Sequence, residues 1–307
     1  MTRIFSDKLH PEMKKQKSGI VLVTYANEAY IESARALEKR AKSVGFSDIR
    51  VFGPSDLTSE FIAKNRETLA FPRGAGYWVW KPAIIENALK SMDESQPLLY
   101  CDAGVMLRRN AKYFEELSQD GLIHIWSPQS HKGSNNFWID KQVWDKIVGV
   151  SEVSKDLHYM AGLILGKNNE TFRKLLGTWL DLCQREHLLR PDSNEEYVPS
   201  TGLIGHRHDQ SILNCLVHLN PSSFHLNLLN SNSRTSPVII HRRSNIKSFS
   251  HAKFLVLVGR IYRYLLNYFP NTLRLAIYTK ITRIRKPHVS EIEIKAHQEI
   301  FFRKLDK

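Results

Sequence analysis

Residues 19–25 read GIVLVTY, an apolar run of the length typical of a buried strand. Apolar residues at helical spacing follow over residues 29–43. Residues 49–52, IRVF, predict a second strand, which the dipeptide Gly53-Pro54 ends. A strand, a helix and a strand in this order form a βαβ unit, and its two strands are parallel neighbours in one sheet. The chain therefore begins as an α/β fold.

The alternation of strands and helices continues to about residue 250, without an internal repeat. The sequence then becomes basic and amphipathic, which predicts helices. We therefore divide the chain into an α/β domain, residues 1–250, and a basic amphipathic helical tail, residues 251–307. Further strands are expected at 98–101, 122–126, 160–166 and 238–240, and further helices at 58–65, 82–90, 112–118, 140–149, 170–187 and 209–218.

The composition is ordinary for a globular protein, with 42% hydrophobic and 24% charged residues in a chain of 307. Three widely spaced cysteines without a CxxC pair argue against a disulfide framework and suit a reducing compartment. The first 17 residues are polar and basic, which predicts no secretory signal. No apolar run approaches the length of about 18 residues that a membrane-spanning helix needs. We therefore expect a cytoplasmic protein.

The net charge of +13 is concentrated in the tail. Residues 252–307 hold twelve Lys and Arg against four acidic residues, a net charge of +8. Apolar side chains at helical spacing over 252–286, surrounded by cations, are typical of helices that lie on an anionic membrane surface. The alternative is that these helices pack their apolar faces on the α/β domain. No nucleic-acid-binding module is recognisable, so we expect an anionic membrane surface as partner and no nucleic acid.

The first candidate functional segment is residues 73–82, RGAGYWVWKP. The pattern Gly74-x-Gly76 is not a dinucleotide-binding fingerprint, because position 79 is Val where a third glycine is required. Two Trp side chains and two basic residues instead lie directly before a predicted helix. Aromatic faces stack on sugars and bases, and a helix start beside basic residues suits a diphosphate. The alternative is that Trp78 and Trp80 anchor the core.

The second segment is the end of the strand at 98–101, which runs into Asp102-Ala103-Gly104. In open α/β sheets, ligands bind in the crevice beyond the carboxyl ends of the strands. Because two small residues follow it, the Asp102 carboxylate can approach a metal ion or a sugar hydroxyl closely. The alternative is an Asp that opens a turn, since Asp and Gly dominate turns.

The third segment, residues 207–210, reads RHDQ and opens a predicted helix. An Asp at a helix start is often a cap. A cap does not explain the adjacent His208 and Gln210, which lie at the same end of the helix. We therefore expect this segment to face the same crevice as Asp102.

The fourth segment, residues 237–243, reads PVIIHRR and predicts a strand that ends in His241 and two arginines. A lone His is more often a structural or surface residue than a ligand. His241 nevertheless ends a strand, as Asp102 does. We expect the two side chains to converge on one divalent ion.

In their order along the chain, these segments resemble the GT-A fold glycosyltransferases, which use nucleotide-sugar donors. Within that superfamily they resemble the glycogenin and lipopolysaccharide galactosyltransferase branch. The resemblance covers about residues 19–245 and implies a Rossmann-like, mostly parallel sheet flanked by helices. The stretch Leu99–Gly104 looks like the strand-ending Asp-x-Asp that binds a divalent metal, with Gly104 in place of the second Asp. Asp209-Gln210 looks like the Asp-Gln motif at a helix start, and His241 like the metal-binding His of a late strand.

The resemblance implies transfer of a sugar from a nucleoside diphosphate sugar. A divalent metal ion, Mn²⁺ or Mg²⁺, would be held by Asp102, His241 and the diphosphate, or Arg242 and Arg243 would take its place. The strand at 160–166 is similar to the segment that shapes the donor-sugar pocket. The candidate residues are Asp102, Asp209 and Gln210 for catalysis, Asp102 and His241 for the metal, and Thr24, Tyr25, Arg73, Trp78, Trp80, Lys81, Gly104, Gly162, His208 and Arg242 for donor binding.

We expect the acceptor to be a glycan or a lipid-linked acceptor. A lipid-linked acceptor explains why a cytoplasmic transferase would be peripheral on the inner face of a membrane, as in surface polysaccharide or lipopolysaccharide synthesis. A catalytically silent membrane adaptor with the same fold is the alternative, and Gly104 in the metal motif favours it. A nucleic-acid-binding protein is a third class. Hydrolysis of nucleotide sugars separates the transferase from both.

Overall fold

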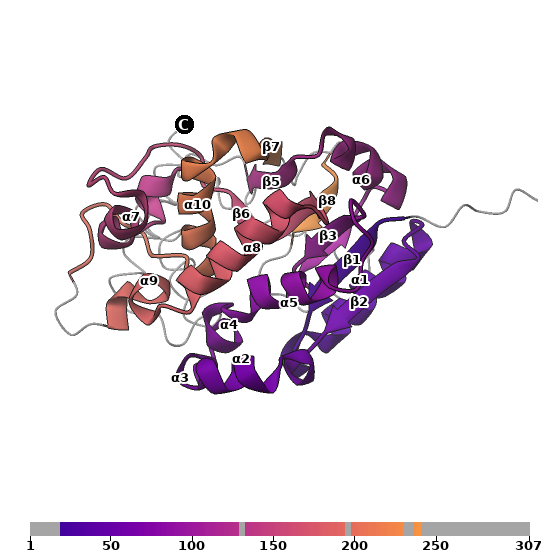
Figure 1. Ribbon diagram of the computed structural model, residues 1–307, viewed down its shortest axis with the longest axis horizontal. Helices are drawn as coiled ribbons and strands as arrows, with labels where there is room; N and C mark the ends of the chain where they lie inside the picture. The colour runs from indigo at the N-terminus through magenta and orange to yellow at the C-terminus, as the bar shows by residue number, and fades with distance from the viewer. Residues whose placement is uncertain (1–18, 129–132, 194–197, 230–235, 241–307) are drawn as a thin grey trace, which may run out of the picture.

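The structure is a computed structural model in which one six-stranded sheet carries helices on both faces (Figure 1). Among the described residues, no helix is long and apolar enough to cross a membrane. The tail at 251–307 and the predicted ligands His241 and Arg242 lie outside the described residues. The structure describes residues 19–128, 133–193, 198–229 and 236–240.

The six-stranded sheet has the order β2-β1-β3-β6-β5-β7. β1 pairs in parallel with β2 and with β3, so that Val21 lies opposite Asp48 and Leu98. β6 runs antiparallel to both its neighbours, whereas β5 and β7 are parallel. The predicted βαβ unit and the predicted fold class, an α/β fold with a mostly parallel sheet flanked by helices, are confirmed. The strands are β1 (Val21–Tyr25), β2 (Asp48–Phe52), β3 (Pro97–Cys101), β5 (Ile123–Pro128), β6 (Met160–Lys167) and β7 (Phe224–Leu229).

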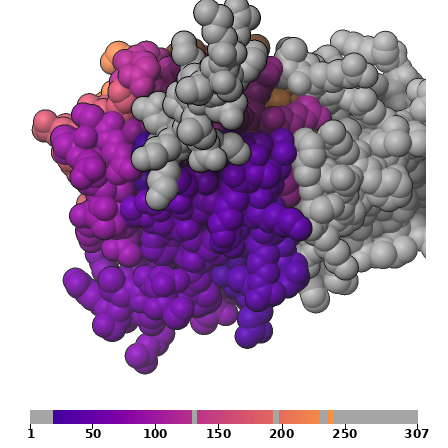
Figure 2. Space-filling view, turned by 90° about the vertical axis from the view of Figure 1, so that its right-hand side faces the viewer, coloured from indigo at the N-terminus to yellow at the C-terminus, as the bar shows by residue number. Residues whose placement is uncertain are grey.

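The two faces of the sheet are covered by different helices, because successive strand residues point to opposite faces. Tyr100 belongs to the core shared with α5, α8 and α10, and Cys101 to the core shared with α1 and α6. Figure 2 shows the N-terminal segments from the side as one continuous surface. The helices are α1 (Ile31–Ser43), α2 (Ser59–Lys64), α3 (Arg66–Leu69), α4 (Gly74–Tyr77), α5 (Trp80–Leu89), α6 (Ala111–Leu117), α7 (Lys141–Val148), α8 (Glu170–Cys183), α9 (Glu186–Leu189) and α10 (Asp209–Leu219).

Polar side chains fix the starts of several helices. Thr58, Asn110 and Asn169 each accept a hydrogen bond from the backbone N–H three residues ahead. Asp140 caps the helix expected at 140–149, since its Oδ1 accepts a hydrogen bond from the backbone N–H of Gln142. The same helix ends at Gly149, which is in the left-handed conformation.

The structure differs from the sequence prediction in several places, among them the short helices α3 and α4, which were not predicted. The helix predicted for 170–187 ends at Cys183, and the short helix α9 follows it. The strand β4 (Val105–Leu107) was not predicted, and it pairs with β8 (Val238–Ile240) in a separate sheet. The strand β7 was not predicted either. It is an edge strand in which His225 and Asn227 interrupt the apolar residues, so its sequence FHLNL shows the alternation of a strand rather than a continuous apolar run.

Candidate active site

A buried lysine joins two carboxyl groups at the carboxyl edge of the sheet. The Lys81 Nζ atom lies 3.0 Å from Asp209 Oδ2 and 3.4 Å from Asp102 Oδ1. Lys81 is the second residue of α5, Asp102 directly follows β3, and Asp209 is the first residue of α10. Three segments far apart in the sequence therefore meet at one ammonium group. We call these three residues the Lys81 cluster.

Asp102 is oriented by contacts on three sides. The Tyr100 hydroxyl donates a hydrogen bond of 2.7 Å to Oδ1. The backbone N–H of Asp102 donates to the carbonyl of Gly162 on β6, and its carbonyl accepts from Val105 N–H, which closes the Asp102–Val105 turn. The side chain remains 41% exposed. Asp102 is thus the member of the cluster that a ligand reaches directly.

Gly162 leaves the space that the Asp102 carboxylate occupies. A Cβ atom built on Gly162 would lie 2.5 Å from Asp102 Oδ2, well inside van der Waals contact. The backbone of this glycine needs no unusual torsion, since its φ is not positive. The residue is therefore required for close approach rather than for conformation.

Asp209 is sealed inside the fold. Its side chain is only 4% exposed, and its backbone carbonyl accepts a hydrogen bond from the Trp179 indole N–H on α8. Asp209 is the first helical residue of α10, and the residue before it, His208, makes no capping hydrogen bond. The carboxylate pairs with Lys81 instead of capping the helix from the preceding position, so the capping alternative does not describe it.

Burial and charge set the protonation of the cluster. Burial raises the pKa of Asp209 to about 6, although the neighbouring Lys81 ammonium lowers it. Burial also lowers the pKa of Lys81, but Asp102 and Asp209 more than offset this, so the pKa lies above its ordinary value. Burial raises the pKa of the Tyr100 phenol well above its ordinary value, which keeps the hydroxyl a donor to Asp102. One firmly held cation thus faces two carboxyl groups.

The aromatic segment directly before α5, which we call the aromatic loop, has a strained backbone and lies beside the Lys81 cluster. Tyr77 and Trp78 both have positive φ, of 52° and 63°. The Trp80 indole N–H donates to the carbonyl of Gly74, and its ring stacks on that of Tyr25 with centroids 3.7 Å apart. Both stacked rings are buried. Trp80 thus lies in the core, as the stated alternative for Trp78 and Trp80 expects, and Tyr25 packs there with it. Trp78 is only partly buried.

His208 lies next to this loop with one unsatisfied ring nitrogen. Its Nδ1 atom donates a hydrogen bond of 2.9 Å to the carbonyl of Leu189, and its buried Nε2 atom has no hydrogen-bond partner. Burial lowers the pKa of His208 well below its ordinary value, so the ring is neutral at neutral pH. The ring centroid is 4.5 Å from that of Tyr77 and 6.1 Å from that of Trp78. His208 therefore joins the aromatic loop to the start of α10.

The structure brings several of the predicted residues together. Lys81, Asp102, Gly162 and Asp209 are in contact, as described above. Thr24 ends in a buried hydroxyl without a hydrogen-bond partner near the carboxyl end of β1. The other predicted residues with described positions are less directly involved: Arg73 is exposed, Gly104 lies in the Asp102 turn, and Gln210 is the second residue of α10.

One functional side chain was missed by the sequence analysis. Tyr100 was treated only as part of an apolar strand, yet its hydroxyl holds Asp102. The signal was present, because residues two apart in an extended chain point to the same face. Tyr100 and Asp102 have this spacing.

The predicted metal site is not formed by the described residues alone. Asp102 Oδ1 is engaged by the Tyr100 hydroxyl and the Lys81 ammonium. Within the part of the chain that the structure describes, Asp102 does not belong to a group of three His, Cys, Asp or Glu side chains with metal-ligand spacing. The described end of β8 does lie close by, since Ile240 pairs with Val105 at the end of the Asp102 turn. His241 is the next residue, and its role as a ligand stays a prediction.

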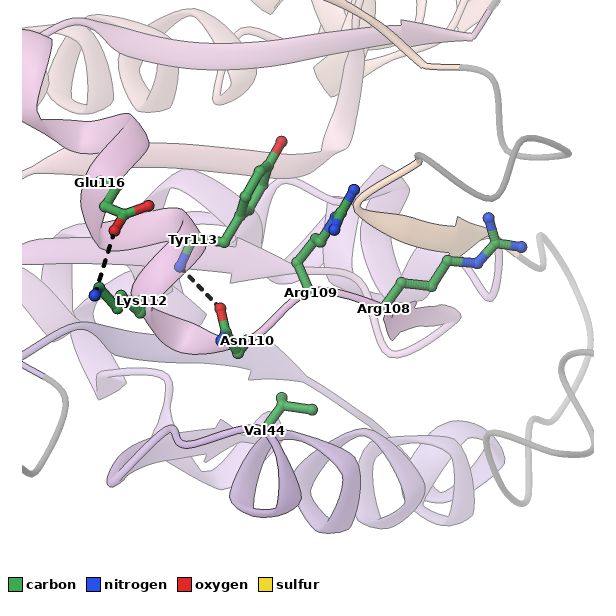
Figure 3. A pocket seen from close by; sticks show the side chains of 7 residues that line it. All are labelled: Val44, Arg108, Arg109, Asn110, Lys112, Tyr113 and Glu116. Atoms are coloured by element: carbon green, nitrogen blue, oxygen red, sulfur yellow. Dashed lines mark hydrogen bonds and ion pairs between the residues drawn. The ribbon is translucent and has the colours of Figure 1, made fainter. Parts of the chain in front are cut away.

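A surface pocket of about 440 Å³ lies elsewhere, between α1 and the start of α6 (Figure 3). In Figure 3, Arg109 and Tyr113 point to the same side, and Lys112 pairs with Glu116 on the same helix. Tyr113 packs on the core that also holds Cys101, so the pocket is on the face of the sheet opposite Tyr100. It is therefore separate from the Lys81 cluster. The lining residues are Val44, Arg108, Arg109, Asn110, Lys112, Tyr113 and Glu116.

No family model matches the sequence, and no curated protein matches it. Among solved structures, the chain is similar to glycosyltransferases. One is a glycosyltransferase involved in the glycosylation of the major capsid of PBCV-1, with 11% identity over 76% of this chain and 98% of that chain and a TM-score of 0.41. Another is the galactosyltransferase LgtC in complex with donor and acceptor sugar analogs, with 13% identity over 78% of this chain and 95% of that chain and a TM-score of 0.40. Because both TM-scores are below 0.5, we base the proposed activity on the side chains of the site itself.

Proposed function

We propose that this protein is a GT-A-type glycosyltransferase that moves a sugar from a nucleoside diphosphate sugar to a glycan or lipid-linked acceptor. The observation that carries the proposal is the Lys81 cluster at the carboxyl end of β3. Ligands of open α/β sheets bind beyond this edge. Carboxylates held in fixed orientation are suited to accept hydrogen bonds from sugar hydroxyls. The resemblance stated from the sequence supports a place for Asp102 and Asp209 in the same site, with Asp102 as a metal ligand and Asp209 beside the sugar or the acceptor.

The charge of the cluster suits the reacting sugar. In transfer from a nucleoside diphosphate sugar, the sugar becomes positively charged and oxocarbenium-like while negative charge grows on the leaving diphosphate. Two carboxyl groups around one ammonium favour the positive sugar over the negative diphosphate. We therefore assign Asp102 to contact with the sugar and Lys81 to holding both carboxyl groups in place. This differs from the sequence-based prediction, in which Lys81 meets the diphosphate directly.

The leaving diphosphate needs cations from another part of the site. The predicted candidates are Arg242 and a divalent metal held by Asp102 and His241. Such an ion would act as a Lewis acid on the diphosphate oxygens. Both Arg242 and His241 lie outside the described residues, so these assignments remain predictions.

The cellular setting remains part of the proposal. We propose a peripheral enzyme on the cytoplasmic face of a membrane that acts in surface polysaccharide or lipopolysaccharide synthesis. The support is the net charge of +8 in residues 252–307, together with their apolar residues at helical spacing. Loss of vesicle binding in a chain that ends near Ser250, with donor hydrolysis kept, is the expected result. Absence of binding by the full chain to anionic vesicles at low salt would overturn the membrane assignment alone.

The activity is tested by a screen of purified nucleotide sugars with the full-length chain. Release of the nucleoside diphosphate is measured with and without Mn²⁺ or Mg²⁺. The Asp102→Asn variant should lose at least about 100-fold in turnover because it removes a charge that faces the reacting sugar. Asp181→Asn, an exposed carboxylate on α8, is the matched control and should retain turnover.

Two results would contradict the proposal. Binding of a nucleotide sugar without hydrolysis or transfer, across the whole panel and with either metal, would favour the silent adaptor. Normal turnover in a folded Asp102→Asn variant would show that the site is elsewhere.

A further inference from the structure

A second group of polar side chains lies on the α1 and α6 side of the sheet. Asp120 Oδ1 is 3.0 Å from His124 Nε2, and Asp120 Oδ2 is 3.0 Å from His225 Nδ1. One ligand atom from each of the three residues lies within 4.8 Å of the other two. The two imidazole rings are stacked, with centroids 4.5 Å apart and planes 14° apart. Among the described residues, this is the one group of three His, Cys, Asp or Glu side chains with metal-ligand spacing.

The topology of the sheet brings these residues together. His124 is the second residue of β5 and His225 the second residue of β7. The two strands are parallel, and their register sets His124 directly opposite His225. Asp120 ends the short helical turn before β5, and its carboxylate also accepts a hydrogen bond from the backbone N–H of Leu122. The arrangement is thus fixed by strand pairing and by a turn rather than by flexible side chains alone.

This group is separate from the Lys81 cluster. Ile123 and Ile125 belong to the core on the α5, α8 and α10 side, so His124 between them points to the opposite face. The Lys81 cluster lies on the α5, α8 and α10 side, with Tyr100. The group therefore does not contact the donor sugar in the proposed reaction.

We propose that Asp120, His124 and His225 bind a zinc ion that joins the edge strand β7 to β5. Two imidazoles and one carboxylate are a ligand set typical of Zn²⁺ and related transition metals, whereas Mg²⁺ and Ca²⁺ prefer oxygen ligands. Ligands about 2.1 Å from a tetrahedral zinc ion lie about 3.4 Å from one another. The separations from Asp120 Oδ1 to His124 and from Asp120 Oδ2 to His225, 3.0 Å each, are near this value, and one ligand atom from each residue lies within 4.8 Å of the others, so a small shift of the side chains admits the ion.

The surroundings of the group also suit a metal. The His124 side chain is 1% exposed and held in place, whereas that of His225 is 49% exposed, which provides a path for entry and an open position for water. The other ring nitrogen of His124, Nδ1, lies 3.4 Å from the side-chain amide nitrogen of Asn227 on β7, a contact that helps to fix the orientation of the ring.

The test uses the full-length chain without a polyhistidine tag, after chelation and dialysis. Titration calorimetry with ZnCl₂ measures stoichiometry and affinity, and Co²⁺ absorption reports tetrahedral coordination. The His225→Gln variant removes one exposed ligand with little risk to the fold. The matched control is His218→Gln, because His218 pairs with Asp156 at 3.2 Å on the surface, and the residues that the structure describes add no third His, Cys, Asp or Glu to this pair.

The expected result is one Zn²⁺ ion per chain in the unchanged protein and in His218→Gln. In His225→Gln the dissociation constant should rise at least about tenfold, as in other sites that lose part of their coordination. Zinc should also raise the melting temperature of the unchanged protein and not that of His225→Gln. Absence of saturable binding, or equal weakening in both variants, would overturn the proposal and leave Asp120 as a plain hydrogen-bond acceptor for two histidines. The donor-hydrolysis assay is independent of this outcome.

Discussion

Replacing Lys81 by Met removes the cation between two carboxyl groups and keeps a side chain of similar length. The ammonium lies 3.0 Å from Asp209 and 3.4 Å from Asp102, and the Lys81 and Asp209 side chains are each 4% exposed. At an effective dielectric constant of about 20, unit charges at this distance attract by about 5 kcal/mol. Removing one partner of a buried ion pair costs about 3–5 kcal/mol, because the remaining charge is left uncompensated. We expect Lys81→Met to lower the free energy of unfolding by about that amount near neutral pH.

The loss should depend on pH in a defined direction. The pKa of Asp209 is raised from 3.8 to about 6 in the folded protein, chiefly by burial. Because the folded-state pKa is raised, burial of the ionised carboxylate lowers the free energy of unfolding. This loss is absent below about pH 4 and grows as the pH rises towards the pKa of the folded state. Without the Lys81 charge the folded pKa is higher still, so the cost continues to grow to higher pH. Lys81→Met should therefore lose less stability at about pH 5 than at about pH 8.

Urea unfolding of the full-length chain, followed by tryptophan fluorescence and circular dichroism, measures both effects. Lys90→Met, at the exposed end of the same helix, is the control and should change stability by less than about 0.5 kcal/mol. The double variant Lys81→Met with Asp209→Asn should recover part of the loss, because no uncompensated charge remains. A loss below about 1 kcal/mol in Lys81→Met, or a loss equal at both pH values, would refute the assignment of Lys81 as the counter-ion of Asp209.

Two further substitutions test the support of Asp102. Gly162→Ala places a Cβ atom 2.5 Å from Asp102 Oδ2, so it should lower the free energy of unfolding in urea by about 1–3 kcal/mol and also lower turnover. The control Gly177→Ala, in open space within α8, should raise the free energy of unfolding by about 0.5–1 kcal/mol. Equal gains in both would contradict the close approach. Tyr100→Phe removes the hydroxyl that donates a hydrogen bond of 2.7 Å to Asp102. It should lower the free energy of unfolding by about 1 kcal/mol and weaken donor binding in a fluorescence titration. Unchanged stability and affinity would exclude a role for this hydrogen bond.

The fold was predictable to the extent that its elements carry local signals. The first strand, helix and strand are marked by an apolar run, by helical spacing and by Gly53-Pro54, and the structure confirms the parallel pair that they imply. The cap at Asp140 is equally local. The edge strand β7 carries a weaker signal, because the apolar and polar alternation of FHLNL spans only five residues. Its place in the sheet follows from pairing with β5, which depends on the whole fold.

The site was predictable in its members more than in their contacts. Asp102, Lys81 and Asp209 were each identified by their position at the end of a strand or the start of a helix. That the lysine would lie between the two carboxyl groups could not be deduced, because their contacts join segments that are distant in sequence. Asp120, His124 and His225 were not identified at all. Their spacing matches no short motif, and only the register of β5 with β7 brings the histidines together.

The backbone around the Lys81 cluster is strained in a way that bears on its role. Positive φ occurs at Ala75, Tyr77 and Trp78 in the aromatic loop and at His208 directly before Asp209. Torsions of this kind cost about 1–3 kcal/mol each and persist only where the surrounding packing holds them. The two strained segments are in contact, since the Tyr77 and His208 rings lie 4.5 Å apart.

Packing against the strained loop fixes where α10 begins. The Leu189 carbonyl holds the His208 ring, and the Trp179 indole holds the Asp209 carbonyl, so the first residue of the helix has little freedom. The Asp209 carboxylate is thereby presented to Lys81 before any substrate arrives. The proposed transfer reaction would gain from such pre-organisation, because charged groups that are already oriented need no rearrangement when charge develops on the sugar. Strain in the loop and burial of the carboxylate therefore serve the same end, a fixed arrangement of the Lys81 cluster at the carboxyl edge of the sheet.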